Sequence, residues 1–354
     1  MSSLAVMPAP KRETCELPCF GLGCAPLGNL FRQWSDGDAD AVLEAAWDVG
    51  VRHFDTAPHY GLGLSEQRLG RFLATKPRDE YVVSTKVGRL LRENAGWDGV
   101  SLDDQGFVVP ARLQRRLDYS AAGVRASVEE SLIRLGLDRV DILYVHDPEL
   151  SGVPRATEEA LTALSTLREE GAVAAIGTGS LGVDALLATA RTGLADVLMV
   201  ANRYTLLDQS VVPAVLEACD EHGTRIVAAA VFNSGLLAST PSRAARYDYG
   251  DVPDDVLVRA LAIDAVCAEH GVELPAAALH YPLLDPRVTS VVVGAAEPEQ
   301  VRQNVARLNA PVPAELWQDL QDRGLVPRPL IAGHRPGVRS SSGSFAIPRS
   351  ARGW

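Results

Sequence analysis

Four residues of types suited to proton transfer stand at or just after the ends of three apolar runs. Asp55 and Tyr60 follow the run VRHF, Lys86 ends YVVSTK, and His146 ends RVDILYVH. A tyrosine hydroxyl has an ordinary pKa of about 10, so by itself it is a poor acid or base at neutral pH. A neighbouring ammonium favours the phenolate, a carboxylate can hold that ammonium in place, and a histidine can position a carbonyl oxygen. The set therefore predicts proton transfer coupled to a step that a cofactor supplies, such as hydride transfer.

Each member of this set also has an ordinary structural interpretation. Asp55 precedes a Thr-Ala-Pro segment, where an aspartate often caps a turn. Tyr60 is compatible with a loop aromatic, and His146 with a hydrogen-bonded core histidine. Lys86 is harder to explain in this way, because lysine is depleted in strands and seldom fully buried without a partner. The occurrence of all four at consecutive strand ends favours a shared site.

The elements that would position these residues alternate between strand-like and helix-like segments, as parallel βα units do. The strand-like runs are nearly continuous apolar stretches, which a sheet buried on both faces requires. Eight units fit the chain. We expect strands within 19–28, 51–55, 81–86, 139–146, 172–179, 196–202, 225–232 and 288–294, and helices at 38–50, 65–74, 120–136, 156–171, 183–192, 210–223, 254–271 and 298–308.

Composition is that of a globular protein with a large core. The chain has 354 residues, of which 47% are hydrophobic and 22% charged, so we expect one domain. A net charge of -11 argues against nucleic acid or an anionic membrane as a partner. The first residues lack a basic start followed by an apolar core, and no run approaches the roughly 20 apolar residues of a membrane span, so we expect a cytoplasmic location. Five cysteines without metal-site spacing predict reduced thiols.

Two long segments resemble signatures of the aldo-keto reductase family. They are FDTAPHYGLGLSEQRLGRFL at 54–73 and RLGLDRVDILYVHDPE at 134–149. The resemblance runs from about residue 21 to about residue 325, and it implies a single-domain (β/α)8 TIM barrel over 1–326 that uses NAD or NADP without a metal. By position, it implies that Tyr60 is the proton donor, that Asp55 and Lys86 tune it, and that His146 orients the carbonyl.

Four shorter segments look like one branch of that family. STKVGRLL, HDPE, NRYTLLDQ and VFNSGLL resemble the branch that contains L-fucose and other D-threo-aldose 1-dehydrogenases and pyridoxal 4-dehydrogenase. This implies a sugar oxidised at its anomeric carbon, or a small carbonyl reduced. A pyridoxal 4-dehydrogenase-like enzyme, a biosynthetic tailoring reductase and a non-catalytic cofactor-binding barrel are the alternatives. The natural substrate, the working direction and the oligomeric state stay open.

Two segments interrupt the βα rhythm, at 87–119 and 233–253, and in a barrel they would be loops at the catalytic face that shape the substrate pocket. The end of the chain, 327–354, is rich in Gly, Ser, Pro and Arg, and we expect a flexible tail; a fold over the pocket is the alternative. The candidate pocket walls are Arg89, Trp97, Tyr119, Phe232, Tyr247 and Tyr249.

The segment VVVGAAEPEQVRQN is the strongest cofactor candidate. A strand there ends in glycine and a helix begins at Pro298, so a phosphate can be held at the helix N-terminus. The resemblance implies that this segment contacts adenosine, with Gln303 and Asn304 at the adenine. Because no cation remains at the positions where NADP-preferring relatives often carry Lys, Ser or Arg, we expect NAD to be preferred. Those positions are Gly294, Ala295, Glu297 and Gln300.

The nicotinamide side departs from the family's commoner pattern. The expected Ser-Asn pair falls near Ser180, without the asparagine. The frequent glutamine of the sixth barrel strand is matched by Ala201 or by Asn202. Phe232 is the nearest substitute for the stacking aromatic of the seventh strand. These departures leave the catalytic set intact but leave the carboxamide contacts open.

A metal-dependent barrel hydrolase is a second class of function to weigh. His53, Asp55 and His59 lie near one predicted strand end, and histidines with a carboxylate are zinc ligands. Lys86 at the next strand end would oppose a cation there. We therefore expect no metal and favour the oxidoreductase.

Overall fold

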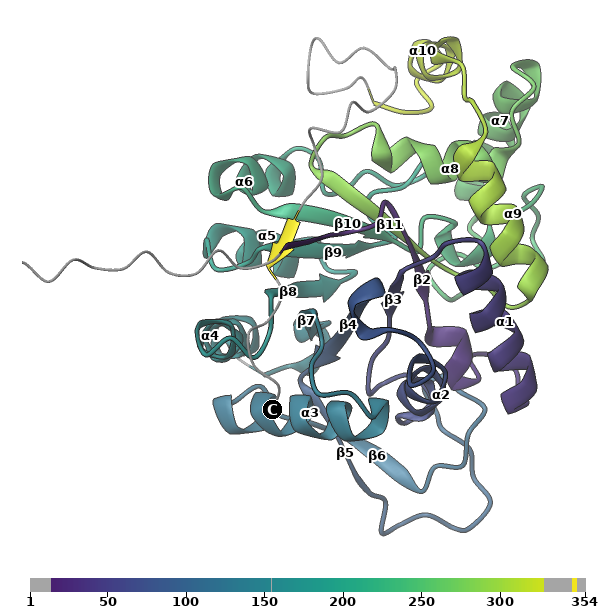
Figure 1. Ribbon diagram of the computed structural model, residues 1–354. Coiled ribbons are helices and arrows are strands. Elements are labelled where there is room, and N and C mark those ends of the chain that lie inside the picture. The colour runs from purple at the N-terminus through teal and green to yellow at the C-terminus, as the bar shows by residue number, and fades with distance from the viewer. Residues whose placement is uncertain (1–13, 154, 328–345, 349–354) are drawn as a thin grey trace, which may run out of the picture.

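The computed structural model describes residues 14–153, 155–327 and 346–348. These residues form a closed barrel of eight parallel strands in the order β10-β11-β2-β3-β4-β7-β8-β9, with helices packed around the outside (Figure 1). The predicted (β/α)8 barrel is confirmed. The barrel strands are β2 (Phe20–Gly23), β3 (His53–Asp55), β4 (Val82–Val87), β7 (Ile142–His146), β8 (Ala175–Ser180), β9 (Val197–Ala201), β10 (Arg225–Ala229) and β11 (Val288–Gly294).

The helices cover the barrel and take their limits from local sequence signals. At the start of α1, the Ser35 side chain accepts from the backbone N–H of Asp38, and the Asp38 carboxylate accepts from Ser35, which is a capping box. At the end of α3, Gly136 takes the left-handed conformation that closes many helices. The helices are α1 (Asp36–Asp48), α2 (Leu64–Leu73), α3 (Ala121–Leu135), α4 (Ala156–Glu169), α5 (Val183–Arg191), α6 (Ala214–His222), α7 (Asp254–Glu269), α8 (Leu274–Leu283), α9 (Pro298–Asn309) and α10 (Ala314–Asp322).

Side chains along each strand alternate between the barrel interior and the layer under the helices. On β7, Tyr144 belongs to the interior cluster, whereas Leu143 and Val145 pack in the outer core beneath the helices. On β4 the same alternation gives Val82 to the interior and Val83 to the outer core. By this alternation Lys86 and His146 must point inward, so the barrel itself aims the predicted catalytic side chains at one another.

Several elements were not predicted. Helix α8 carries two prolines and is apolar along most of its length, so it lacks the amphipathic period by which a surface helix is recognised. Helix α10 follows the last barrel unit. The predicted loop at 87–119 contains an antiparallel strand pair, β5 (Arg89–Glu93) and β6 (Leu113–Leu117), with the register Leu91↔Arg115.

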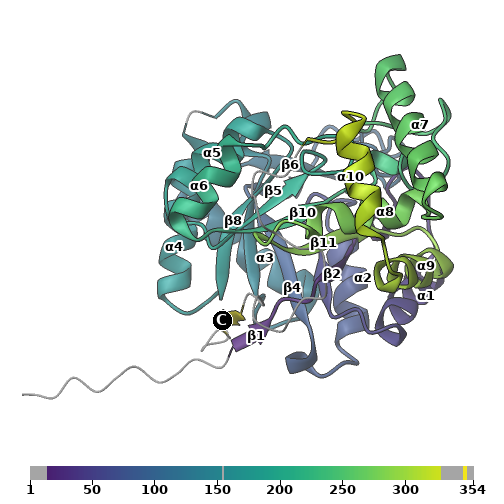
Figure 2. The same cartoon turned by 90° about the horizontal axis from the view of Figure 1, so that it is seen from above.

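A second short strand pair lies outside the barrel. Strand β1 (Thr14–Glu16) pairs with β12 (Ala346–Pro348), and Figure 2 shows β1 at the opposite end of the barrel from β5 and β6. The predicted flexible tail lies mostly outside the described residues, apart from residue 327 and the three residues of β12. No described helix combines the length and the apolarity that a membrane crossing needs.

Candidate active site

The structure brings the four predicted catalytic side chains to the carboxyl ends of β3, β4 and β7. Lys86 Nζ lies 2.6 Å from Asp55 Oδ2, and both side chains are almost completely buried. The other carboxylate oxygen of Asp55 accepts the Ser84 hydroxyl at 2.7 Å. Lys86 also donates to the carbonyl of Thr56 at 2.9 Å. The lysine is thus held in one position by charge and by backbone.

Tyr60 lies in the loop between β3 and α2 and reaches the same point. Its ring centroid lies 4.7 Å from Lys86 Nζ, and the His146 ring is perpendicular to it at 5.8 Å. The loop is fixed by contact between two glycine backbones. Cβ atoms at Gly28 or Gly61 would collide with main-chain atoms of the facing segment, so the approach requires glycine on both sides.

Burial and the ion pair set the protonation states of the site. Burial raises the pKa of Tyr60, and the ammonium of Lys86 opposes only part of that rise. Burial works against the charge of Lys86, but Asp55 outweighs it, so the pKa of the ammonium is raised. Burial, helped by Arg89 and Lys86, holds the pKa of His146 well below its ordinary value. At neutral pH the site therefore holds a protonated tyrosine, a charged lysine and a neutral imidazole.

Polar groups line the side of the site next to His146. Arg89 Nη2 donates to Asp147 Oδ2 at 2.9 Å, and Arg89 Nη1 lies 3.2 Å from Nδ1 of His59. The Asp147 oxygen that Arg89 contacts also lies 3.3 Å from His146 Nε2. Tyr119 donates to the carbonyl of His146 at 3.4 Å. Of the predicted wall residues, Arg89 and Tyr119 therefore contact the catalytic region directly.

Two further aromatic residues reach this site from distant loops. Phe107 packs edge-on against His59 at 5.2 Å and lies 6.1 Å from the Tyr60 ring; it was not predicted. Tyr249 comes from the predicted loop 233–253; it is about half exposed and interacts electrostatically with Asp147 and Tyr60. Phe107 could not be predicted from the sequence, because nothing in its local segment indicates that its side chain packs against the site.

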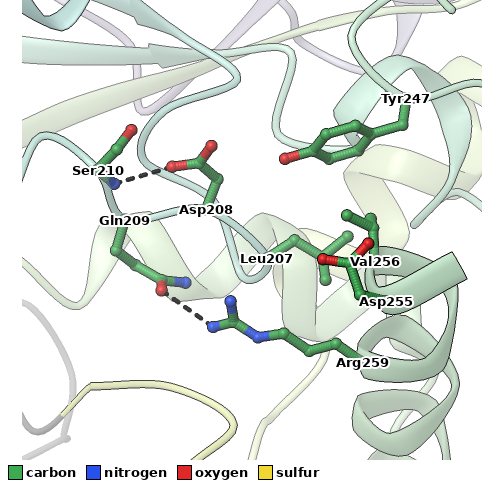
Figure 3. A pocket seen from close by; sticks show the side chains of 8 residues that line it. All are labelled: Leu207, Asp208, Gln209, Ser210, Tyr247, Asp255, Val256 and Arg259. Carbon is green, nitrogen blue, oxygen red and sulfur yellow. Dashed lines mark hydrogen bonds between the residues drawn. The ribbon is translucent and has the colours of Figure 1, made fainter. Parts of the chain in front are cut away.

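Two of the predicted wall residues, Trp97 and Tyr247, lie elsewhere. Trp97 bonds the carbonyl of Ser101 and stacks with Arg112 on the outer part of its loop. Tyr247 lines a cavity of about 340 Å³ beside the loop after β9, where Figure 3 shows it facing Asp208 across the opening. Neither contacts the four catalytic candidates in the described residues.

A larger cavity of about 510 Å³ adjoins the polar wall, although none of the four catalytic candidates lines it. Arg89 and Asp147 line it, together with the Arg115–Asp103 ion pair, whose shorter contact is 2.6 Å. Its volume falls in the range of small-molecule sites. Because guanidinium and carboxylate groups face it, this cavity suits a ligand rich in hydroxyl groups.

The candidate nicotinamide contacts differ in whether their polar groups are free to bond a ligand. Ser180, at the end of β8, donates its hydroxyl to Glu149 at 2.6 Å, so a carboxamide would have to compete for that proton. Asn202 is completely buried directly after β9, and neither atom of its amide has a hydrogen-bond partner among the described residues. A buried amide without a partner is costly, and a ligand carboxamide is its natural complement. Phe232 is buried after β10. Asn202 is the feature that best fits a bound nicotinamide.

The candidate adenosine segment forms the end of β11 and the start of α9. Glu297 is the N-cap residue of α9 and makes no side-chain capping bond, and Gln300 accepts the backbone N–H of Ala296 at 2.7 Å. Asn304 is buried, whereas Gln303 is exposed. The open N-terminus of this helix fits a phosphate. Gly294 is exposed and Ala295 is buried at the same strand end.

A cation that was not predicted from the sequence lies beside this segment. Arg32, in the loop after β2, donates to the carbonyl of Ala296 at 2.7 Å. The two residues are 264 positions apart in the chain, so no local pattern connects them. This contact bears directly on which cofactor the site prefers.

The residues considered for a metal site are bonded in other ways. His53 Nε2 lies 3.3 Å from the Ser84 hydroxyl, Asp55 pairs with Lys86, and His59 faces Arg89. Within the described ranges, no group of three or more His, Cys, Asp or Glu side chains is arranged to hold a metal ion.

Comparison with known proteins gives one consistent result. Residues 20–323 match the model of the aldo/keto reductase family. A D-threo-aldose 1-dehydrogenase of a Pseudomonas species is 53% identical, over 91% of this chain and 98% of that protein. A pyridoxal 4-dehydrogenase of Microbacterium luteolum is 38% identical, over 89% and 96%. Among solved structures, an aldo-keto reductase of Bacillus halodurans is similar in fold, with a TM-score of 0.69 at 24% identity, over 92% of this chain and 99% of that chain.

Proposed function

This chain belongs to the aldo/keto reductase family and is an NAD(P)-dependent oxidoreductase, and we propose that it oxidises aldoses at the anomeric carbon to lactones. The predicted family resemblance is confirmed. The observation that carries the proposed substrate class is the polar wall beside His146. Arg89, Asp147, Arg115 and Asp103 supply charged donors and acceptors there, which suit a hydroxylated sugar better than an apolar aldehyde. The 53% identical relative is named for an activity of this class.

The proposed chemistry divides between the protein and the cofactor. When bound, NAD(P) supplies the hydride acceptor or donor. In oxidation, Tyr60 accepts the proton of the anomeric hydroxyl in its phenolate form, which the Lys86 ammonium stabilises, so the oxidation is favoured at high pH. In reduction the same hydroxyl of Tyr60 protonates the carbonyl oxygen. We assign to neutral His146 the donation of an N–H to that oxygen, and to Asp55 the fixing of Lys86.

We propose the cofactor contacts from the geometry of the strand ends. Asn202, with help from Ser180 and Phe232, would hold the nicotinamide. The N-terminus of α9 would hold a phosphate, and the adenine would lie against Gln303 and Asn304.

We further propose that NAD is preferred over NADP. The carboxylate of Glu297 would repel a 2′-phosphate, which needs a cation such as arginine. Arg32 is the nearby cation, and it is engaged with the carbonyl of Ala296. One missing charge-assisted bond predicts a loss of about tenfold or more for NADP. Glu297→Arg should therefore shift the preference toward NADP.

Steady-state kinetics with both cofactors test the preference. The wild type, Glu297→Arg and Arg32→Ala should be compared for kcat/KM with NAD and with NADP. A wild type that uses NADP more efficiently, and loses that efficiency in Arg32→Ala, would show that Arg32 serves the phosphate and that the NAD preference is wrong.

The reaction itself is tested by the absorbance of the reduced nicotinamide across a panel of free sugars, aldehydes and ketones. Oxidation of L-fucose or another aldose to a lactone supports the proposal. Activity on pyridoxal but on no free aldose would move the assignment to the chemistry named for the 38% identical relative. The cytoplasmic location expected from the sequence stays a prediction, to be checked by cell fractionation.

A further inference from the structure

The residue directly after His146 points to the same place as His146. Successive side chains of a strand normally point to opposite faces. Asp147 escapes this alternation because its backbone is left-handed, with φ 39° and ψ 58°. Its N–H bonds the carbonyl of Gly179 at 3.0 Å, which holds the turn. An aspartate tolerates this conformation, but it is uncommon and is found at functional sites more often than elsewhere. The turn brings a carboxylate to 3.3 Å from His146 Nε2.

The carboxylate of Asp147 has room for one more hydrogen bond. It accepts from Arg89 at 2.9 Å and from the backbone N–H of Leu181, and it lies against the ring of His146. An ionised carboxylate offers about four lone-pair sites, so these two donors leave acceptor positions for a ligand. Burial raises its pKa to about 6, with Arg89 opposing the rise, so the group is ionised at neutral pH. The same side chain faces the cavity of about 510 Å³.

We propose that Asp147, held by Arg89, binds the hydroxyl group on the carbon next to the reacting anomeric carbon. This rests on the proposed aldose oxidation. Oxygens on adjacent sugar carbons are about one hydrogen-bond length apart, which matches the 3.3 Å between His146 Nε2 and the Asp147 oxygen. With the anomeric oxygen at His146, the neighbouring hydroxyl falls at Asp147. The rest of the sugar is then directed past Arg89 and Asp147, which also line the cavity of about 510 Å³.

The arrangement also couples this hydroxyl to the catalytic histidine. Without a ligand, the Asp147 oxygen lies 3.3 Å from His146 Nε2. When a sugar binds, its hydroxyl donates to Asp147, and the imidazole N–H donates to the anomeric oxygen. A substrate without that hydroxyl leaves Asp147 competing for the imidazole proton. Such a substrate therefore loses one bond to Asp147 and weakens a second at the reacting oxygen.

The test compares L-fucose with 2-deoxy-L-fucose in the wild type and in Asp147→Asn. A charge-assisted hydrogen bond corresponds to about a 10- to 100-fold effect, so wild-type kcat/KM should be lower for the 2-deoxy sugar by at least that factor. Asp147→Asn should lower kcat/KM for L-fucose by about 10- to 100-fold and change it little for the 2-deoxy sugar. The ratio between the two sugars then falls toward one. Retained turnover of the 2-deoxy sugar shows that the variant is folded.

Two further variants sharpen the experiment. Asp104→Asn makes the same substitution at a carboxylate that lines the same cavity but bonds the Gln105 side chain, and it should keep the wild-type ratio. Arg89→Lys keeps the charge but cannot reach Asp147 and His59 together, and it should lower the ratio partway. Arg89 is a positioning residue in this scheme.

Three outcomes have distinct meanings. A wild type that oxidises both sugars equally well overturns the role of Asp147 while leaving aldose oxidation in place. An Asp147→Asn enzyme with an unchanged ratio does the same. A wild type inactive on every aldose would instead remove the proposed function on which the inference rests.

Discussion

Replacing Tyr60 by phenylalanine removes one oxygen from the proposed site and leaves the charges around it in place. The Lys86–Asp55 pair, at 2.6 Å, does not depend on the hydroxyl, since Asp55 is also bonded by Ser84 and Lys86 by the carbonyl of Thr56. The fold and the cofactor site should therefore survive. General acid–base catalysis contributes about 10² to 10⁴ in rate, so kcat should fall by that factor, or about 3 to 5 kcal/mol in barrier height.

The assay is steady-state turnover under conditions where the chemical step limits the rate, with cofactor binding measured separately by fluorescence titration. Tyr144→Phe is the matched control. Tyr144 lies in the barrel interior on the strand that carries His146, and its hydroxyl has no hydrogen-bond partner within the described residues. The control should keep near wild-type turnover. A Tyr60→Phe enzyme that binds cofactor and also keeps near wild-type turnover would refute the proton-transfer role.

Two other substitutions test the electrostatics of the barrel. Lys86→Met removes the charge that opposes the burial-raised pKa of Tyr60, so that pKa should rise further and oxidation should require higher pH; an unmoved pH–rate profile would contradict the tuning role. The same change leaves Asp55 buried without its cation and should destabilise the protein by about 3 to 5 kcal/mol in urea unfolding. Arg134→Met should have a destabilising effect of similar size, since Glu66 is completely buried and loses its 2.6 Å partner; an unchanged unfolding midpoint would contradict this expectation.

The barrel and the four catalytic candidates were accessible from sequence for the same physical reason. A parallel strand is a short apolar run, and a polar residue that ends such a run has only the rim of the barrel to occupy. Asp55 and His146 are the last residues of β3 and β7, and Lys86 is the penultimate residue of β4, so their meeting follows from strand order alone. Helix α8 was missed because its uniform apolarity carries no 3.6-residue period.

The walls of the site were less accessible, because they depend on contacts between loops. Phe107 reaches Tyr60 through a pairing of its loop with the loop after β2, where Leu30 bridges Phe107. Trp97, in the same insertion, is just as aromatic and yet packs with Arg112. Nothing in residue type separates these two cases. The two residues differ only in which loop each one packs against. No local pattern in the sequence indicates how two loops far apart in the chain pair with each other.

A left-handed residue directly after a barrel strand recurs at the rim. It explains why several candidate site residues do not follow the in–out alternation of strand side chains. Asp147, Asn202 and Ala230 each follow the last residue of a barrel strand, and each has a positive φ, of 39°, 59° and 54°. Left-handed backbone costs a non-glycine residue roughly 1 to 2 kcal/mol, and the penalty is reduced for Asp and Asn. The turn reverses the normal alternation, so a residue that should point away from the barrel axis can stay beside it. Two of these three residues are functional candidates: Asp147 supplies the carboxylate next to His146, and Asn202 the buried amide without a partner among the described residues. Strained backbone conformations of this kind are concentrated at functional sites.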